Sequence, residues 1–306
     1  MIREILSLCA CDTGHQAMYS RLRQAMVAFQ EKAVDDSWNR LLHEAERQGL
    51  APLLYHHSRR IDIQPPKNMQ RLLHSLYLRS RHANDVRCKA TAKILNRYHS
   101  ADIPVLLVKG IALCNLVYQD PGLRPMRDID LLVNKSDLAA AKETLLDLGY
   151  LPEKGHDIPD DYYHLPPMVK KIQGLPVTIE LHHNLLPFHP RYPLWPLEKS
   201  YDNGQHLSID GVQTRTLSLE DTLWYVYLHG FQAPLTYESF RLMHVADIMT
   251  LIDKHLDQIN WQKLQGELPT LINAISRLHY LTPFQDRVIS KLRLTVKKQP
   301  AKIGVP

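Results

Sequence analysis

Two aspartates separated by a single residue are the part of this sequence best suited to chemistry. Asp128, Ile129 and Asp130 open a run whose remaining residues are apolar, as is typical of a buried strand. Because side chains alternate along a strand, both carboxylates point to one face while Ile129 points into the core. Adjacent carboxylates repel one another unless a cation neutralises them. A hard divalent cation such as Mg²⁺ binds carboxylate, water and phosphate oxygens, so the spacing indicates a metal site that can handle phosphates.

The segments on either side of this pair carry groups that suit metal and phosphate. The apolar run at residues 105–108 predicts a buried strand that ends at Lys109 and Gly110, directly before a helix. Backbone amides at a helix N-terminus form an anion site, which a ligand approaches closely because glycine has no side chain. Glu180 lies in a later strand-like run and is expected to bring a third carboxylate. Three carboxylates holding two metal ions suit in-line phosphoryl transfer.

Several neighbouring polar residues have more than one interpretation. Alternation places His182 on the face of Glu180, where it either binds metal, orients a carboxylate or is an ordinary hydrogen-bonded histidine. Of Arg124 and Arg127, one is expected to face ligand phosphates and the other to be a structural ion-pair partner. Lys109 either contacts phosphate or extends its ammonium group to water.

Two groups further along the chain are weighed in the same way. Tyr162, Tyr163 and His164 lie on a proline-bearing loop, and we hypothesise that they form a lid over a base or an acceptor. His229 and Asp247 lie in the C-terminal part and are interpreted as buried, satisfied polar residues rather than catalysts.

The order of these motifs resembles a known superfamily. A strand ending in glycine, a helix, Asp-x-Asp on the next strand and a later carboxylate resemble the DNA polymerase beta-like nucleotidyltransferases. More narrowly, the stretches VLLVKGIAL, RPMRDIDLLV, LLDLGY and VTIELHHNL are similar to a bacterial uncharacterised nucleotidyltransferase family. This similarity covers roughly residues 100 to 185.

The resemblance implies a role for each matching residue. Asp128 and Asp130 would be catalytic metal ligands, and Glu180 the third acid, either a general base or a further ligand. The cofactor would be Mg²⁺ or Mn²⁺. Gly110 would lie at the phosphate-binding turn, with Lys109, Arg124 and Arg127 as further phosphate-binding candidates. The wider superfamily commonly has Gly-Ser or Gly-Gly at this turn, whereas this chain has Lys109-Gly110, so a lysine charge would replace the serine hydroxyl.

The elements around these motifs must hold them in place. Apolar periodicity predicts a long helix over residues 68–98 and C-terminal helices over residues 220–231, 237–255 and 261–281. The basic residues of the long helix, Arg87 among them, are interpreted as a solvated face rather than a nucleic-acid surface. A hairpin is expected within residues 169–182.

We therefore expect an α+β fold, with a nucleotidyltransferase-like mixed sheet core flanked by N- and C-terminal helices. The expected domains are residues 1–100, an N-terminal helical region packing on the core, residues 101–217, the α/β core, and residues 218–306, the C-terminal helical region.

Composition narrows the class of protein. The chain has 306 residues, of which 44% are hydrophobic and 23% charged, with a formal net charge of +5. This is ordinary for a globular protein and too weakly basic to indicate nucleic acid by itself. No apolar run approaches about 18 residues, so no membrane span is expected. The four cysteines form no CxxC pair, which favours a reducing compartment and a cytoplasmic location.

Three functions compete at this point. The first is a metal-dependent transfer of a nucleoside monophosphate from an NTP to an acceptor, with release of pyrophosphate. The acceptor is open between a small molecule, a protein and an RNA end, and no feature indicates an oligomeric state. The second is a catalytically inactive protein of the same fold that binds a nucleotide or a partner. The third is a glycosyltransferase that uses the Asp-x-Asp motif for a nucleotide sugar.

Overall fold

The computed structural model describes residues 1–34, 36–153, 155, 159, 162–187, 195–231 and 241–294. The chain divides into two compact units. We call residues 1–80, 117–125 and 223–306 the helical unit, and residues 81–116 and 126–222 the sheet unit. All three acids of the expected site belong to the sheet unit.

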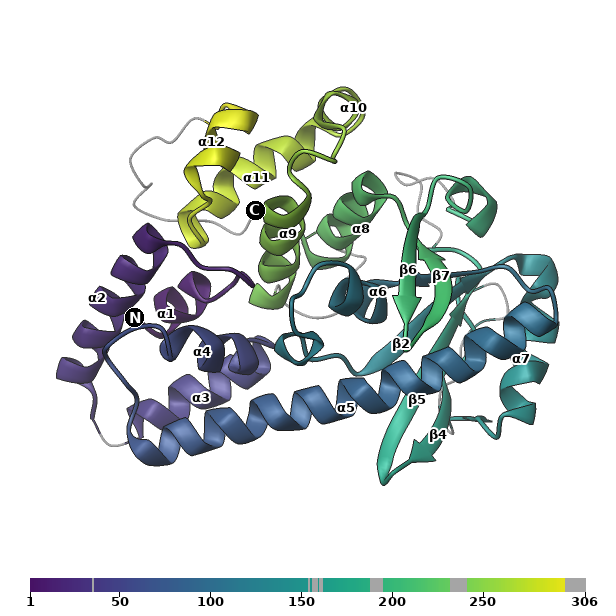
Figure 1. The fold of residues 1–306 in the computed structure, drawn as a ribbon, viewed down its shortest axis with the longest axis horizontal. Coiled ribbons are helices and arrows are strands. Elements are labelled where there is room, and N and C mark those ends of the chain that lie inside the picture. The colour runs from purple at the N-terminus through teal and green to yellow at the C-terminus, as the bar shows by residue number, and fades with distance from the viewer. Residues whose placement is uncertain are drawn as a thin grey trace. The chain divides into compact units, whose positions relative to one another are not determined.

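In the described residues, the sheet unit is built around a seven-stranded mixed sheet with the order β3-β4-β5-β2-β1-β7-β6 (Figure 1). β2 runs antiparallel to β1 and parallel to β5, and β1 runs parallel to β7. The strands are β1 (Val105–Val108), β2 (Asp128–Val133), β3 (Leu151–Pro152), β4 (Met168–Ile172), β5 (Leu175–His182), β6 (Gln205–Ile209) and β7 (Val212–Thr216). The expected α+β fold with a mixed sheet is confirmed, as is the hairpin, which β4 and β5 form.

The helices fall into both units. The sheet unit contains α6 (Lys109–Leu116), α7 (Leu138–Asp147) and the short 3-10 helices η2 (Lys135–Asp137) and η3 (Leu197–Lys199). The helical unit contains α1 (Ile2–Leu8), α2 (Gln16–Lys32), α3 (Ser37–Arg47), α4 (Ala51–Ser58), η1 (Pro121–Leu123), α9 (Leu242–His255), α10 (Trp261–Glu267), α11 (Pro269–Leu281) and α12 (Asp286–Leu292). α5 (Lys67–Ser100) begins in the helical unit and continues into the sheet unit, and α8 (Leu219–Phe231) does the reverse.

One face of the sheet forms the core of the sheet unit together with α5 and α7. Ile129 of β2 and Ile179 of β5 are fully buried in one cluster with Ile94 of α5 and Ala141 of α7. The hydroxyl of Tyr98 donates to the carbonyl of Ala141 at 3.1 Å and links the two helices. Because the odd-numbered residues of β2 and β5 face this core, their even-numbered residues lie on the opposite face.

Some expectations need correction. The helix expected over residues 261–281 is two helices, because Pro269 lacks an N–H group and starts a new helix, α11. Arg87 does not lie on a solvated face, since only 9% of it is exposed. Of the helix expected over residues 237–255, the first four residues lie outside the described part of the chain, and α9 begins at Leu242.

Across the described residues, none of the helices has both the length and the apolar composition needed to cross a lipid bilayer.

Candidate functional site

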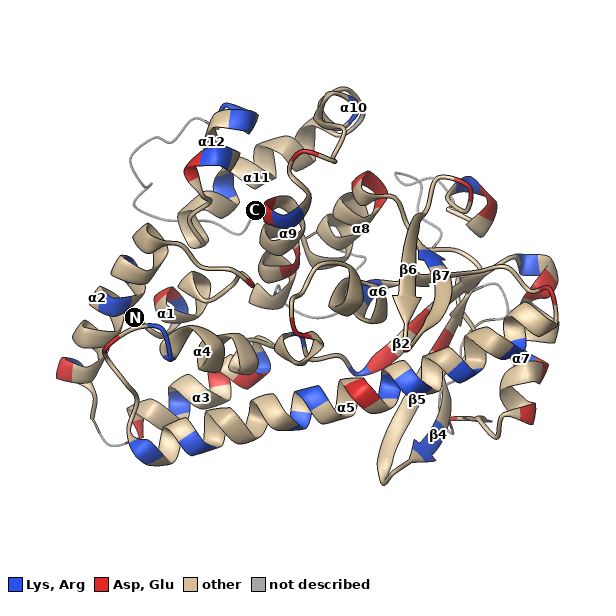
Figure 2. Cartoon of the chain, in the orientation of Figure 1, with Lys and Arg blue, Asp and Glu red and all other residues tan. Residues whose placement is uncertain are grey.

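The pairing of β2 with β5 places the three expected acids on neighbouring strands. Asp130 lies opposite Glu180. Asp128 lies opposite Thr178, two residues earlier in the same ladder. Figure 2 shows the acidic segments of the two strands side by side in the sheet. Since Ile129 and Ile179 occupy the buried face, Asp128, Asp130 and Glu180 share the other face. The structure therefore brings these three residues together.

Lys109 reaches the same face from the end of β1. Its neighbour Val108 lies opposite Asp130 in the β1–β2 ladder. Lys109 has a φ of 52°, a left-handed conformation that residues with a Cβ atom rarely adopt. Its Nζ lies 2.5 Å from Asp130 Oδ1 and 3.7 Å from Glu180 Oε2. The ammonium group is thus within ion-pair distance of two of the three acids.

His182 is the second partner of Asp130. Its Nε2 lies 3.0 Å from Asp130 Oδ1 and 3.5 Å from Glu180 Oε2. The ring is fully buried, and its Nδ1 has no hydrogen-bond partner among the described residues. A histidine that binds metal through one nitrogen almost always donates its other N–H to a partner. The contact of Nε2 with Asp130 Oδ1 therefore suits a donor that orients this carboxylate.

The two aspartates have opposite electrostatic environments. Burial opposes ionisation of Asp130, but the Lys109 ammonium group and the His182 hydrogen bond outweigh it and hold the pKa of Asp130 below its usual range. For Asp128, burial and then the charge of Asp130 raise the pKa to about 6. As the pH rises, Asp130 is therefore the first of the two to ionise, and Asp128 follows at about pH 6.

The donor set fits a divalent cation. Asp130 Oδ2 is buried and has no hydrogen-bond partner in the described parts of the chain, although buried polar atoms are rarely left unpaired. Asp130, Glu180 and His182 each offer an atom within 4.8 Å of the others. Carboxylate oxygens are the ligands that Mg²⁺ and Mn²⁺ prefer. Of the three expected acids, Asp130 and Glu180 belong to this group and could hold such an ion, while Asp128 lies on the same face of β2.

Two of the three aromatic residues of the expected lid lie against this cluster. The rings of Tyr163 and His164 have centroids 5.5 and 5.0 Å from that of His182. Burial lowers the pKa of His164, which keeps its ring neutral at neutral pH. Other residues of the same loop, 156–158 and 160–161, lie outside the described part of the chain.

The two arginines have different surroundings. Arg124 belongs to the helical unit and donates to both carboxylate oxygens of Asp247 at 2.7 and 2.8 Å. Arg127 belongs to the sheet unit, is exposed and directly precedes Asp128. Gly110 is buried in the first turn of α6. Asp247 is the buried, satisfied residue that the sequence indicates.

Arg87 is a buried charged residue, in contrast to the solvated position expected from the sequence. It lies on α5 in the sheet unit, and its Nε has no hydrogen-bond partner among the described residues. Burial lowers its pKa, whereas the charge of Asp128 acts in the opposite direction. Arg87 precedes the buried Ala90 by three residues, so helical spacing could have placed it on the apolar face.

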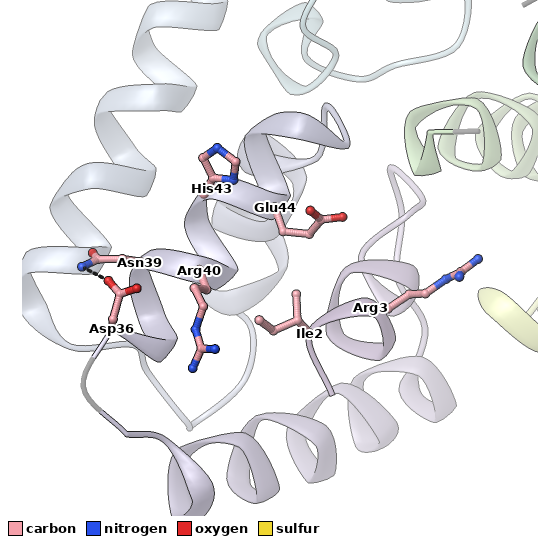
Figure 3. A pocket seen from close by; sticks show the side chains of 7 residues that line it. All are labelled: Ile2, Arg3, Asp36, Asn39, Arg40, His43 and Glu44. Carbon is pink, nitrogen blue, oxygen red and sulfur yellow. Dashed lines mark hydrogen bonds between the residues drawn. The ribbon is translucent and has the colours of Figure 1, made fainter. Parts of the chain in front are cut away.

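A separate open pocket of about 670 Å³ lies in the helical unit (Figure 3). It is formed by α1 and by the start of α3, and Asn39 donates to Asp36 at its rim at 2.9 Å. Its lining residues are exposed or half-buried. The lining residues are Ile2, Arg3, Asp36, Asn39, Arg40, His43 and Glu44. None of these lining residues is a buried polar residue. The acid cluster of the sheet unit differs, because it contains the buried Asp130.

The chain belongs to the family of uncharacterised nucleotidyltransferases, whose model matches residues 35–274, more than half of the sequence. The family assignment rests on this match. No curated protein matches the chain.

Solved structures share a partial similarity with the chain. An antigenic nucleotidyltransferase-like protein from Paracoccidioides brasiliensis is 19% identical with a TM-score of 0.47, over 70% of this chain and 94% of that one. ANT(2'')-Ia in complex with adenylyl-2''-tobramycin is 16% identical with a TM-score of 0.39, over 61% and 98%. A nucleotidyltransferase structure from Thermotoga maritima is 15% identical with a TM-score of 0.33, over 46% and 81%.

Proposed function

We propose that this protein is a metal-dependent nucleotidyltransferase that transfers a nucleoside monophosphate from an NTP to an acceptor and releases pyrophosphate. The observation that carries the proposal is the register of β2 and β5, which sets Asp130 opposite Glu180 with Asp128 on the same face. Family membership supports the reaction class. Membership of this family does not favour the hypothesis that the Asp-x-Asp motif belongs to a glycosyltransferase.

Each residue of the site has a task in this reaction. Bound Mg²⁺ or Mn²⁺ would neutralise charge on the phosphates and activate the attacking oxygen. Asp128, Asp130 and Glu180 would hold the ion, and Glu180 is alternatively the general base for the acceptor. His182 keeps Asp130 oriented through its Nε2–H.

The triphosphate requires positive charge and amide donors close to these acids. Gly110 lies in the first turn of α6. Backbone N–H groups at a helix N-terminus can donate hydrogen bonds to an anion such as phosphate. Lys109 and Arg127 flank the acids and would contribute charge. Arg124 is held by Asp247, so we assign the arginine contact with phosphate to Arg127.

The acceptor belongs to one of three classes, a small molecule, a protein hydroxyl or an RNA end. Labelling a cell extract with each α-labelled NTP, followed by separation into these three fractions, identifies the class. None of the four cysteines, all of which lie in the described part of the chain, forms a disulfide bond, which supports a reducing compartment, and we propose the cytoplasm.

The first test is thermal unfolding with each of the four NTPs, with and without Mg²⁺. A ligand near 100 times its Kd should stabilise the folded state by about 2.7 kcal/mol. We expect one NTP to give a metal-dependent shift, and Asp130→Asn to abolish both the shift and pyrophosphate release. Asp137→Asn, which changes an acid of η2 outside the site, is the control and should behave as wild type. Transfer that survives in Asp130→Asn would show that the assigned role is wrong.

The second candidate function is a nucleotide- or partner-binding protein without turnover. It is favoured by the missing serine after Gly110, where the chain has Ile111, and by the pairing of Lys109 with Asp130. In this case a nucleotide would stabilise the wild type, and no pyrophosphate would appear with any acceptor fraction.

A further inference from the structure

The Lys109 ammonium group already neutralises carboxylates that are proposed to hold the metal. Nζ lies 2.5 Å from Asp130 Oδ1 and 3.7 Å from Glu180 Oε2. Because the ligand atoms of this cluster all lie within 4.8 Å of one another, a divalent ion bound by both acids would lie close to Nζ. Like charges a few ångströms apart in a buried site repel strongly. Lysine and metal therefore compete for the same two carboxylates, Asp130 and Glu180.

We propose that Lys109 is an internal counter-ion that occupies the metal position in the metal-free protein and is displaced from Asp130 when the divalent ion binds. This inference rests on the proposed metal site and adds the order in which metal and nucleotide bind there. Lys109 becomes available to the nucleotide phosphates only after the metal has entered. Metal loading thus controls the phosphate-binding group.

The environment of Asp130 explains why a counter-ion is needed. Asp130 is fully buried, and a buried carboxylate without a cation is costly. Two groups donate to Asp130 Oδ1, the His182 ring and the Lys109 ammonium group. Of these, the lysine supplies a full charge in the metal-free protein.

The position of Lys109 also allows it to leave. Its side chain is 18% exposed, so the end of its stem can reach water. Lysine has a flexible four-carbon stem, unlike the rigid fork of arginine. The left-handed backbone of Lys109 is strained for any residue with a Cβ atom, and such strain is often found where a side chain has to be aimed at a functional site.

The test is calorimetric titration of Mg²⁺, and separately of Mn²⁺, into the nucleotide-free protein at about pH 8, where free carboxyl groups are ionised. Lys109→Met should bind the ion on the order of tenfold more tightly than wild type, because no charge-assisted hydrogen bond has to be broken. Lys109→Arg keeps the competing charge and should bind no more tightly than wild type. Lys171→Met removes the same charge from an exposed position of β4 and is the control.

A second measurement uses the wild type and needs no variant to fold. The rate of acetylation of Lys109 by a water-soluble acylating reagent, read by peptide mass spectrometry, should rise several-fold when Mg²⁺ is added, because the amine is no longer held in its ion pair with Asp130. The rate for Lys171 should stay the same.

The outcomes separate this inference from the proposed function. Wild type that binds metal, with Lys109→Met no tighter and Lys109 acetylation unchanged, would overturn the counter-ion role and leave the metal site standing. Failure of every variant to bind either ion would overturn both. Tighter binding in Lys109→Met, together with faster acetylation in wild type, supports the inference.

Discussion

Arg124 and Asp247 form a bidentate ion pair inside the helical unit. The hydroxyl of Tyr118 also donates to Asp247 Oδ1, at 2.8 Å. Both charged side chains are almost fully buried, with 7% and 1% exposed. The arginine fork matches the carboxylate geometry, so the two charges satisfy one another without water. Loss of one partner leaves an uncompensated buried charge, which costs roughly 3–5 kcal/mol.

We therefore predict that Arg124→Met lowers the free energy of unfolding by about 3 kcal/mol or more, measured by urea unfolding followed by circular dichroism. Arg79→Met is the matched control, because its ion pair with Glu46 is exposed and contributes little. A normal urea midpoint with loss of the NTP-dependent stabilisation would instead show that Arg124 contacts the phosphates.

At the scale of elements, α7 ends in a motif that only glycine suits well. Gly149 follows the helix with a φ of 81°, and the N–H of Tyr150 donates to the carbonyl of Leu145 at 2.9 Å. This pattern closes the helix and satisfies its last carbonyls. Glycine adopts a positive φ without strain, so Gly149 suits this helix end.

The same substitution at two glycines should therefore have opposite effects. Gly149→Ala should lower stability by about 1 kcal/mol, because alanine is strained at positive φ. Gly266→Ala lies within α10, where an added Cβ meets no atom within 4 Å, and should raise stability by roughly 0.5–1 kcal/mol. Differential scanning calorimetry of both variants checks the pair. Equal effects of the two changes would mean that the backbone conformation at Gly149 does not govern the result.

The sequence could predict the elements of the site but not all of their contacts. The apolar runs of β1 and β2 are local signals, and strand alternation alone puts Asp128 and Asp130 on one face. The pairing of β5 with β2 is a tertiary choice, so the register that sets Asp130 opposite Glu180 comes only from the structure. The ion pair of Lys109 depends on that register as well.

Other features were missed for different reasons. The β6–β7 hairpin turns at Asp210 and Gly211, both with positive φ, and the Asp-Gly pair is a strong hairpin signal that was available in the sequence. The charge of Arg87 favours a solvated position, but its helical spacing from the buried Ala90 puts it on the apolar face of α5.

At the scale of the whole molecule, stability depends on every group whose pKa differs between the folded and unfolded chain. His57 is fully buried, and we assign its Nε2 as donor to the carbonyl of Cys11 at 2.7 Å, with Nδ1 accepting from the Tyr19 hydroxyl at 3.1 Å. The neutral ring is therefore satisfied on both sides. Burial lowers the pKa of His57 from 6.5 to about 3.

This shift predicts a loss of stability on acidification. The unfolded chain takes up the proton near pH 6.5 and the folded chain only near pH 3, so the stabilisation is present above pH 6.5 and declines as the pH falls between these values. The slope is at most about 1.4 kcal/mol per pH unit. Asp128 and Asp253 act in the opposite direction, since burial raises the pKa of each to about 6. The contribution of His57 is therefore read as a difference between two proteins.

His57→Gln removes the titrating group while keeping a side-chain N–H for the Cys11 carbonyl. Urea unfolding of wild type and His57→Gln, in steps from pH 7.5 to about pH 4.5, gives the difference in unfolding free energy at each pH. We expect wild type to lose stability relative to His57→Gln as the pH falls below about 6.5, by up to about 1.4 kcal/mol per unit. A pH-independent difference would show that His57 is not held neutral in the folded chain.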